Sequence, residues 1–396
     1  MSENRLLIMD DDRDVAAFFG TVGEGMGFEV LALHDPNRFF DSVSSFDPNL
    51  MLLDLQMPGR DGIELLRELG HRQCSANIFI ASGLDSRVLM TAEQLGRSLG
   101  LNMAGSFCKP IGLEELQQLL LTHKHEQRII TAGQLAEAIE GGHLVVHYLP
   151  KVTFKGPGRW IIEGAEALVR WEHAEYGLLY PDEFLGLAEK TGLITGLTDF
   201  VFRAAMQQAR VWFQNGLYME LGLNLSAQFL GDLEFPDRLL TLVRENDLDP
   251  SMVTLELTET AAMQDPDVTM DILTRLRVKN INLCLDDFGL GYSSLTHLYR
   301  MPFSEVKLDN SFINDMRTSP DAQALVEGLI YLSHKLKIRA CAEGVEDEAT
   351  MVLLEGMGCD KMQGHYVGAA MRAKELADLV ETWNTRFRAE SFSAAG

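Results

Sequence analysis

The chain has 396 residues, of which 46% are hydrophobic, so it can bury more than one core and has the length of two or three domains. Its 58 acidic and 34 basic residues give a formal net charge of −24, which argues against a surface that binds nucleic acid through bulk charge. Any phosphate ligand therefore requires local cations, either metal ions or a few placed Arg and Lys side chains.

The cysteines and the N-terminal segment bear on the compartment. The five cysteines are widely spaced without a C-x-x-C pair, which indicates buried thiols in a reducing compartment. The start, MSENRLLIMDDD, lacks the basic region and apolar core of a signal peptide, and no window reaches the ~18 apolar residues of a membrane span. We expect a soluble, cytoplasmic protein that has no membrane span and, lacking a basic recognition helix, binds no DNA.

The first 125 residues alternate short apolar runs with helix-like segments. This rhythm favours a doubly wound α/β fold, with a parallel sheet and helices on both of its faces. Functional groups in such sheets collect at the carboxyl ends of the strands. The polar residues that close the apolar runs 5–9, 49–58, 77–82 and 104–110 are Asp10, Asp11, Asp12, Asp54, Ser82 and Lys109.

These strand-end residues share a chemistry. Clustered carboxylates hold a hard cation such as Mg²⁺ through oxygen ligands, while the cation, Lys109 and a hydroxyl can neutralise a phosphoryl group on Asp54. Any one of them alone is more simply explained as a polar group at the end of a strand. Four polar strand ends in this order favour a site.

Residues 3–122 resemble a response-regulator receiver domain, with its flavodoxin-like fold, through IMDDD, LLDLQMPGRDG, ASG and CKP. The resemblance implies a sensor histidine kinase or small phosphodonor as partner. Ser106 stands where the family usually has an aromatic residue. The implied site comprises the phosphoacceptor Asp54, the acid pair Asp10 and Asp11 that binds one Mg²⁺ with it, the switch hydroxyl of Ser82 and the phosphoryl contact Lys109.

A helix-rich segment joins this domain to the rest of the chain. Thr131 stands three residues before Gln134, a capping-box pattern, and the segment that they begin ends in Gly-Gly. We predict a receiver domain at 1–125, a helical connector at 126–142 and a second domain at 143–396.

Eight strand candidates alternate with helix candidates in the second domain. Eight β/α units in about 250 residues fit a TIM-like (β/α)8 barrel. Only a short Gly/Pro turn at 155–159 separates the first two strands, so the first strand could pair antiparallel. The strand candidates are 144–150, 164–171, 220–226, 253–259, 281–288, 305–310, 337–346 and 360–368.

Polar side chains stand at or near the carboxyl end of seven successive strands of this predicted barrel, ends that meet at one mouth. Solvent exposure explains any single one better than a site does, but not all seven together. Such carboxylates would repel one another without cations, and Mg²⁺ and Mn²⁺ prefer oxygen ligands. The residues are Glu166 with Arg170, Asn224, Glu256 with Glu259, Asp286 with Asp287, Lys307 with Asp309, Glu343 with Glu346, and Gln363.

The adjacent Asp286 and Asp287 raise a question of geometry. Neighbouring side chains on a regular strand point to opposite faces, so both reach the mouth only if the strand ends there, which Gly289 and Gly291 permit. Two ions about 3.5–4 Å apart can activate a water and neutralise both oxygens of a phosphoryl displacement. A protein-kinase interpretation of the D-F-G run fails, because no Gly-rich phosphate loop, V-A-I-K lysine or H-R-D run accompanies it.

Residues 130–385 resemble an EAL-type cyclic di-GMP phosphodiesterase. The motifs are EALVRW, LNLS, ELTE, LDDFGLGYSSL, VKLDNSFI, CAEGVE and GCDKMQGHY. The resemblance implies hydrolysis of cyclic di-GMP to linear pGpG with two Mg²⁺ or Mn²⁺ ions. The implied ligands are Glu166, Asn224, Glu256 and Asp286 for the first ion, and Asp286, Asp287 and Asp309 for the second.

The same resemblance implies roles for the other mouth residues. Leu149 and Leu290 depart from the family pattern, which usually has a glutamine and a small residue there. The implied roles are Glu343 as general base, Lys307 and Glu166 as further catalytic residues with Lys307 orienting the water, Glu346 and Gln363 as substrate-side support, Arg170 as phosphate contact and Glu259 as anchor of the loop that begins at Phe288.

These features together predict a two-component response regulator whose output is metal-dependent hydrolysis of cyclic di-GMP, modulated by phosphorylation of Asp54. The alternative is a catalytically weak or inactive receptor that binds cyclic di-GMP and acts through a partner. A homodimer or higher homo-oligomer is implied by the resemblance alone.

Overall fold

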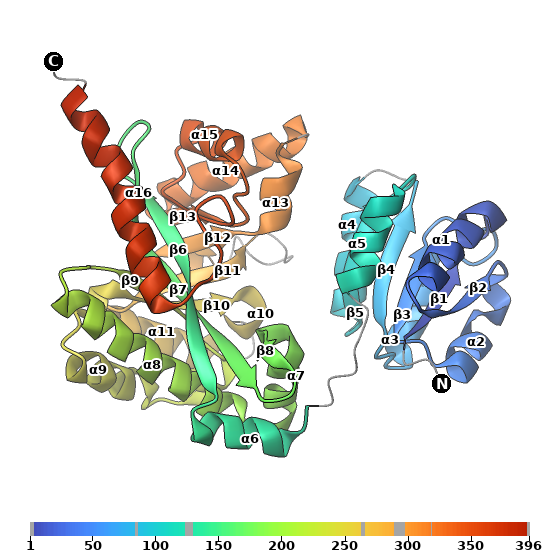
Figure 1. The fold of residues 1–396 in the computed structure, drawn as a ribbon, viewed down its shortest axis with the longest axis horizontal. Helices are drawn as coiled ribbons and strands as arrows, with labels where there is room; N and C mark the ends of the chain where they lie inside the picture. The colour runs from blue at the N-terminus through green and yellow to red at the C-terminus, as the bar shows by residue number, and fades with distance from the viewer. Residues whose placement is uncertain are drawn as a thin grey trace. The chain divides into compact units, whose positions relative to one another are not determined.

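A computed structural model of the chain describes residues 4–83, 86–122, 130–262, 266–288, 298–317 and 319–393. It divides the chain into two compact units, Met1–Ile129 and Ile130–Gly396, shown in Figure 1. None of the described helices combines the length and the hydropathy that a membrane crossing needs.

The first unit is a parallel sheet covered by helices on both faces, which confirms the predicted doubly wound α/β fold. In its described part, five strands lie in the order β2-β1-β3-β4-β5. The strands are β1 (Arg5–Met9), β2 (Glu29–Leu33), β3 (Leu50–Asp54), β4 (Asn77–Ser82) and β5 (Asn102–Cys108), and the helices are α1 (Arg13–Gly25), η1 (Pro36–Arg38), α2 (Phe39–Phe46), α3 (Gly62–His71), α4 (Ser86–Ser98) and α5 (Leu113–Thr122).

The apolar strands form because both faces of the sheet are buried. Alternate residues of one strand enter different cores: Leu7 and Met9 face the helices α2 to α4, whereas Leu6 and Ile8 face α1 and α5. All five residues of β3 are buried. Because the preceding strand residues are apolar and packed in the two cores, the carboxylates of Asp10 and Asp54 lie at the carboxyl ends of β1 and β3.

The second unit is a closed barrel, which confirms the TIM-like prediction. In its described part, eight strands close through the pairing of β6 with β7, and β8 adds to the edge of β7. The strands are β6 (Leu144–Phe154), β7 (Trp160–His173), β8 (Gly177–Leu179), β9 (Glu220–Asn224), β10 (Val253–Thr258), β11 (Asn282–Phe288), β12 (Glu305–Leu308), β13 (Arg339–Ala342) and β14 (Lys361–Gln363).

The first barrel strand has the opposite direction to the others. β6 pairs antiparallel with both β7 and β14, while the pairs from β7 through β9 to β14 are parallel. The short turn after β6 explains this, because a parallel pair requires a long crossover. The antiparallel first strand predicted from the sequence is therefore confirmed.

Helices surround the barrel. The predicted capping box is present at the start of α6, where Gln134 N–H donates to Thr131 Oγ1 and Thr131 N–H donates to Gln134 Oε1. The predicted domain limits stay a prediction. The helices are α6 (Ala132–Gly141), α7 (Pro181–Thr191), α8 (Ile194–Gln214), η2 (Ala227–Gly231), α9 (Phe235–Glu245), η3 (Pro250–Met252), α10 (Glu259–Ala262), α11 (Pro266–Val278), α13 (Asn310–Asp315), α14 (Pro320–Lys335), α15 (Glu348–Gly356) and α16 (Ala373–Ser393).

Candidate active site

Lys307 lies at the centre of a buried group of carboxylates in the barrel. Its Nζ lies 2.8 Å from Glu166 Oε2 and 2.6 Å from Glu256 Oε2. It also lies 2.9 Å from Glu343 Oε1 and 3.4 Å from Asp286 Oδ2. The acids come from β7, β10, β11 and the residue after β13, so barrel closure gathers them. We call these five residues the mouth cluster.

Two amide side chains complete the cluster. Asn224, the last residue of β9, donates from Nδ2 to Glu166 Oε1 at 2.8 Å. Gln363, the last residue of β14, donates from Nε2 to Glu166 Oε2 at 3.0 Å and to Glu343 Oε1 at 2.8 Å. The structure thus brings together seven residues that the sequence placed at strand ends.

Burial and charge shift the acids of the mouth cluster in opposite directions. Burial raises the pKa of Glu343 to about 7, against the opposing charge of Lys307 and with the help of Asp286. Burial acts in the same direction on Glu166, but Lys307 and Lys151 outweigh it and lower the pKa of Glu166 to about 2. Environment therefore separates two glutamates that share one ammonium group.

The mouth cluster carries an excess of negative charge. Four carboxylates share Lys307, and burial together with Glu166 raises the pKa of Glu256. The buried Gln363 Oε1 accepts no hydrogen bond within the described part of the chain. Carboxylate and amide oxygens with surplus negative charge suit a hard divalent cation such as Mg²⁺ or Mn²⁺.

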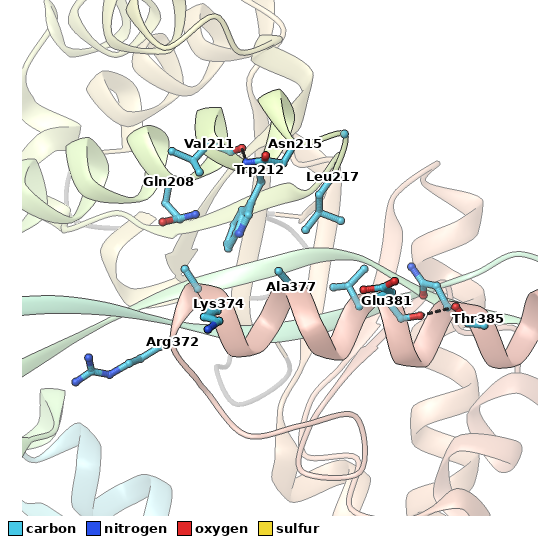
Figure 2. Close-up of a pocket in the computed structure, with 14 residues that line it drawn as sticks. Gln208, Val211, Trp212, Asn215, Leu217, Arg372, Lys374, Ala377, Glu381 and Thr385 are labelled. Atoms are coloured by element: carbon cyan, nitrogen blue, oxygen red, sulfur yellow. Dashed lines mark hydrogen bonds between the residues drawn. The ribbon is translucent and has the colours of Figure 1, made fainter.

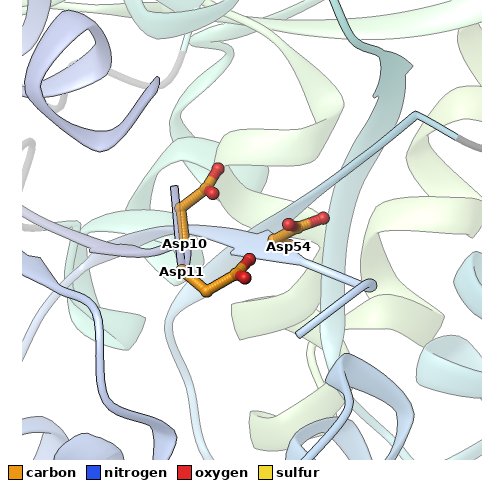
Figure 3. Close-up of side chains that lie close together, drawn as sticks. All are labelled: Asp10, Asp11 and Asp54. Atoms are coloured by element: carbon orange, nitrogen blue, oxygen red, sulfur yellow. The ribbon is translucent and has the colours of Figure 1, made fainter. Parts of the chain in front are cut away.

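The first unit gathers its own acids at the ends of its strands. Asp10, Asp11 and Asp54 each offer a carboxylate oxygen, and these oxygens all lie within 4.8 Å of one another. Figure 3 shows the three side chains close together. Lys109 Nζ lies 2.6 Å from Asp10 Oδ2 and 2.9 Å from Asp54 Oδ2. Lys109 N–H donates to the carbonyl of the fully buried Ser82 at 2.8 Å. The five residues predicted from the sequence thus lie together.

Backbone groups fix two of these aspartates. The N–H of Asp12 donates to Asp10 Oδ1 at 3.0 Å, and the N–H of Gln56 donates to Asp54 Oδ1 at 3.2 Å. Burial raises the pKa of Asp10, while the hydrogen bond from Lys109 opposes that rise. Three acids against one ammonium group suit a divalent cation here too.

Two family models match the chain. One is the EAL domain, over residues 132–370, and the other is the response regulator receiver domain, over residues 6–121. The chain belongs to the EAL domain family. Its first unit carries a response regulator receiver domain, so the two resemblances inferred from sequence motifs are confirmed.

Relatives of the chain include two proteins of Pseudomonas aeruginosa. It is 31% identical over 340 residues to the cyclic di-GMP phosphodiesterase RocR of Pseudomonas aeruginosa, covering 83% of this chain and 86% of RocR. It is 40% identical over 253 residues to the bifunctional diguanylate cyclase/cyclic di-GMP phosphodiesterase MucR of the same organism, covering 63% of this chain but only 36% of MucR. The likeness to MucR therefore concerns the EAL domain.

Solved structures show the same relationship. The PaMucR phosphodiesterase in complex with c-di-GMP is 40% identical, with a TM-score of 0.58 over 62% of this chain and 98% of that chain. The EAL enzyme Bd1971, bound to cAMP and cyclic di-GMP, is 26% identical, with a TM-score of 0.60 over 68% of this chain and 73% of that chain.

The aspartate pair of the EAL domain lies within a strand. β11 continues through the pair to Phe288, in agreement with the strand candidate 281–288, so the strand end that would let both side chains face the mouth is not at the pair. Its register with β12 shifts between Leu285 and Phe288, and Asp287 has a φ of 55°. A bulge of this kind re-aims side chains without ending the strand. The glycines invoked for the strand end, Gly289 and Gly291, lie outside the described residues.

Two other predicted residues of the EAL domain lie outside the mouth cluster. Asp309 follows β12 and caps α13, where its Oδ1 accepts the Ser311 N–H at 2.9 Å. Glu346 has a 53% exposed side chain that lies 3.9 Å from Arg317 Nη1. The metal and substrate-side roles predicted for this pair stay predictions.

Arg170 and Glu259 are buried near the same end of the barrel. The Arg170 guanidinium lies 4.9 Å from the Tyr180 ring centroid, and its Nη1 donates to the Val169 carbonyl. Burial lowers the pKa of Arg170. Glu259 begins α10, but most of the loop that it was predicted to anchor, including Leu290, lies outside the described residues.

The departures from the family pattern have visible consequences. Ser106 donates from Oγ to Glu93 Oε2 on α4 at 3.0 Å, whereas Phe107 packs edge-on against Phe19 at 5.9 Å between ring centroids. Ser106 thus forms a hydrogen bond to α4 from the position where the receiver family usually has an aromatic residue. In the EAL domain, Leu149 lies opposite Glu166 in the ladder between β6 and β7.

Sequence reasoning missed Lys151 on β6. Its side chain is buried, and its Nζ lies 3.1 Å from Glu256 Oε1 and 3.5 Å from Glu305 Oε1. A signal was available, because the run LPKV places a lysine inside an apolar strand, and a buried lysine requires an acidic partner.

A second ionic group lies beyond Lys151, and we call it the floor cluster. It consists of the buried Glu305 and Lys361 and the partly exposed Glu220 and Arg339. These residues begin β9, β12, β13 and β14, at the opposite end of the strands from the mouth cluster. Lys361 Nζ lies 2.7 Å from both Glu220 Oε2 and Glu305 Oε2, and Arg339 Nη2 lies 3.2 Å from Glu305 Oε2. Two acids and two cations balance there.

A cavity of about 830 Å³ lies away from the mouth cluster. It is an open space between α8 and α16 on the outside of the barrel, and Figure 2 shows side chains of α8 such as Trp212 facing α16. None of the mouth-cluster residues lines it. This cavity therefore does not coincide with the candidate active site.

Proposed function

We propose that this protein is a response regulator that hydrolyses one phosphodiester bond of cyclic di-GMP to give linear pGpG, and that phosphorylation of Asp54 modulates the rate. The observation that carries the catalytic part is the mouth cluster, in which four carboxylates surround one buried ammonium group. Support for the substrate comes from the relatives, since RocR is named a cyclic di-GMP phosphodiesterase and the PaMucR structure is a c-di-GMP complex.

Acids of the mouth cluster, together with Asn224, Asp287 and Asp309, would hold two divalent ions, Mg²⁺ or Mn²⁺. Bound ions of this kind supply an activated water and neutralise the oxygens of the phosphodiester. The proposed ligands are Glu166, Asn224, Glu256 and Asp286 for one ion, and Asp286, Asp287 and Asp309 for the other.

Glu343 is the proposed general base. It is mostly buried, and burial raises its pKa to about 7, near the value at which a carboxylate accepts a proton efficiently at neutral pH. Lys307 and Gln363 hold Oε1 of Glu343 at 2.9 and 2.8 Å, which leaves its other carboxylate oxygen to accept the proton of the attacking water.

Several side chains are proposed to orient the substrate. Arg170 supplies guanidinium donors that suit a phosphate, with Glu346 and Gln363 supporting the substrate side of the site. Lys307 keeps Glu166 ionised and in place through their contact at 2.8 Å. Glu259 is proposed to anchor the loop that begins at Phe288.

The receiver domain is the proposed regulator. A sensor histidine kinase or a small phosphodonor would phosphorylate Asp54, with one Mg²⁺ held by Asp10, Asp11 and Asp54. Lys109, 2.9 Å from Asp54, and Ser82 would contact the phosphoryl group. The receiver fold and the gathered acids support this assignment.

The deciding experiment is a turnover assay of the full chain with cyclic di-GMP and Mg²⁺ or Mn²⁺, accompanied by calorimetric binding of cyclic di-GMP in Ca²⁺. We expect conversion to pGpG by the wild type and binding without turnover by Glu343→Gln. Binding without turnover by the wild type would instead identify a cyclic di-GMP receptor, the alternative function.

Regulation and assembly require separate measurements. Turnover before and after treatment with a small phosphodonor should differ for the wild type and stay equal for Asp54→Asn. Equal rates and equal assembly of the wild type under both conditions would contradict a regulatory role for Asp54. Light scattering of both states tests the predicted homodimer or higher oligomer.

A further inference from the structure

Glu256 receives a buried cation on each side of its carboxylate. Oε2 lies 2.6 Å from Lys307 Nζ within the mouth cluster, and Oε1 lies 3.1 Å from Lys151 Nζ on the side of the floor cluster. The glutamate is 1% exposed, so water does not solvate it. Each of its two carboxylate oxygens therefore contacts a different lysine.

The neighbouring strand leaves room for this carboxylate. Gly222 on β9 pairs in register with Thr254 of β10 and with Glu166 of β7. A Cβ atom at position 222 would overlap Oε1 of Glu256 and lie 3.1 Å from its Cδ. Gly222 is not among the glycines with positive φ, so the requirement is for space rather than for an unusual backbone conformation.

Lys151 is not needed to neutralise the floor cluster. Its other contact, Glu305, already lies 2.7 Å from Lys361 Nζ and 3.2 Å from Arg339 Nη2. The contact of Lys151 with Glu256 is shorter than its contact with Glu305, at 3.1 against 3.5 Å. What Lys151 contributes is thus a partner for the oxygen of Glu256 that faces away from the mouth.

We propose that Lys151 and Gly222 are positioning residues for the metal site: they fix the carboxylate of Glu256 so that Oε2 is presented to the mouth. This rests on the proposed function, in which Glu256 is a metal ligand. Lys151 touches neither the ion nor the substrate and acts only through Glu256. Partners of this kind typically contribute 10–100-fold, roughly, to metal affinity.

The test is calorimetric titration of the full chain with Mn²⁺, in an Asp11→Asn background that weakens the receiver metal site. Lys151→Met should bind Mn²⁺ about 10–100-fold more weakly than the same chain with Lys151. The matched control is Lys361→Met, because Lys361 is an equally buried lysine that contacts Glu220 and Glu305 but not Glu256. We expect it to lower the melting temperature and leave the Mn²⁺ affinity unchanged.

Gly222→Ala provides a second variant that keeps every charge, and it should also weaken Mn²⁺ binding. Wild-type affinity in folded Lys151→Met or Gly222→Ala, or an equal loss of affinity in Lys361→Met, would overturn the proposal. The proposed function fails separately: a wild type that binds Mn²⁺ in the mouth but does not hydrolyse cyclic di-GMP would contradict the phosphodiesterase activity alone.

Discussion

The two ends of the barrel differ in how many cations contact their acids. The floor cluster pairs two acids, the buried Glu305 and the partly exposed Glu220, with Lys361 and Arg339, and Lys151 adds a further contact to Glu305. The mouth cluster buries four acids around one lysine. A balanced group is complete without a ligand, whereas an acidic surplus leaves room for added positive charge.

The pKa values of glutamates at the two ends of the barrel also differ. Burial acts to raise the pKa of Glu305, but Lys361, Lys151 and Arg339 outweigh it and lower the pKa to about 2. In the mouth cluster the outcome differs between acids: burial is outweighed at Glu166 by Lys307 and Lys151, which lower its pKa to about 2, whereas burial prevails at Glu343 and raises its pKa to about 7. The fully buried Glu305 is thus a structural carboxylate and the partly exposed Glu343 a candidate base, because Glu305 contacts three cations and Glu343 contacts Lys307.

The largest expected effect is that of Glu343→Gln on turnover. Losing the proton acceptor should lower kcat by roughly 10²–10⁴-fold. The free energy of unfolding without metal should not fall, because the change removes one acid from a group with surplus negative charge. Steady-state kinetics and urea unfolding in EDTA measure the two quantities, and an unchanged kcat would remove Glu343 from the mechanism.

Glu305→Gln is the same chemical change at the other end of the barrel, and the outcome should be reversed. It removes Glu305 as a partner of Lys361, Arg339 and Lys151. Because Glu220 still contacts Lys361 and Arg339, the free energy of unfolding should fall by about 3 kcal/mol, the lower end of the range for a broken buried ion pair. The folded fraction should lose far less kcat than Glu343→Gln does. Similar stability losses in the two variants would show that the clusters do not differ as described.

Added metal ions should stabilise the mouth but not the floor. With Mn²⁺ at a hundred times its dissociation constant, the wild type should gain about 2.7 kcal/mol of unfolding free energy. Asp286→Asn, which removes a proposed ligand of both ions, should gain less. Thermal unfolding of both proteins, with and without Mn²⁺, provides the comparison, and an equal gain would exclude Asp286 as a ligand.

Acid should weaken the floor cluster gradually. The pKa of Glu305 is lowered from 4.5 to about 2 in the folded state, so its stabilisation is fully present above 4.5 and is lost as pH falls through about 2. Urea unfolding of the wild type over that range, in EDTA, should show falling stability. Glu305→Gln should show a shallower dependence, and parallel curves would contradict the assignment.

The sequence was enough to predict both folds. Alternating apolar runs and helical segments predicted a doubly wound sheet followed by a barrel, and the short turn at 155–159 predicted the antiparallel first strand. The limits of strands were less predictable: β13 ends at Ala342, although the sequence suggested a strand to residue 346. Local patterns indicate the type of an element better than its end, since tertiary packing decides where pairing stops.

By itself, the sequence determined which chemical groups stand at the strand ends. Glu256 and Lys307 stand near the carboxyl ends of their strands, which a parallel barrel directs to one mouth, whereas Glu166 lies in the middle of β7. The motifs of all three identified the EAL family. Asp10 and Asp54 follow the same rule in the receiver domain. Strand direction and the spacing of residues along a strand are local properties, so they can be predicted from the sequence without knowledge of tertiary contacts.

Only the tertiary structure decided which charged side chains contact one another. Lys151 and Glu256 are 105 residues apart in the chain, yet their side chains share a hydrogen bond. The central place of Lys307, the bulge at Asp287 and the space that Gly222 leaves for Glu256 likewise depend on barrel closure. Register between distant strands sets these contacts, and the resulting balance of charge distinguishes the floor cluster from the proposed metal site.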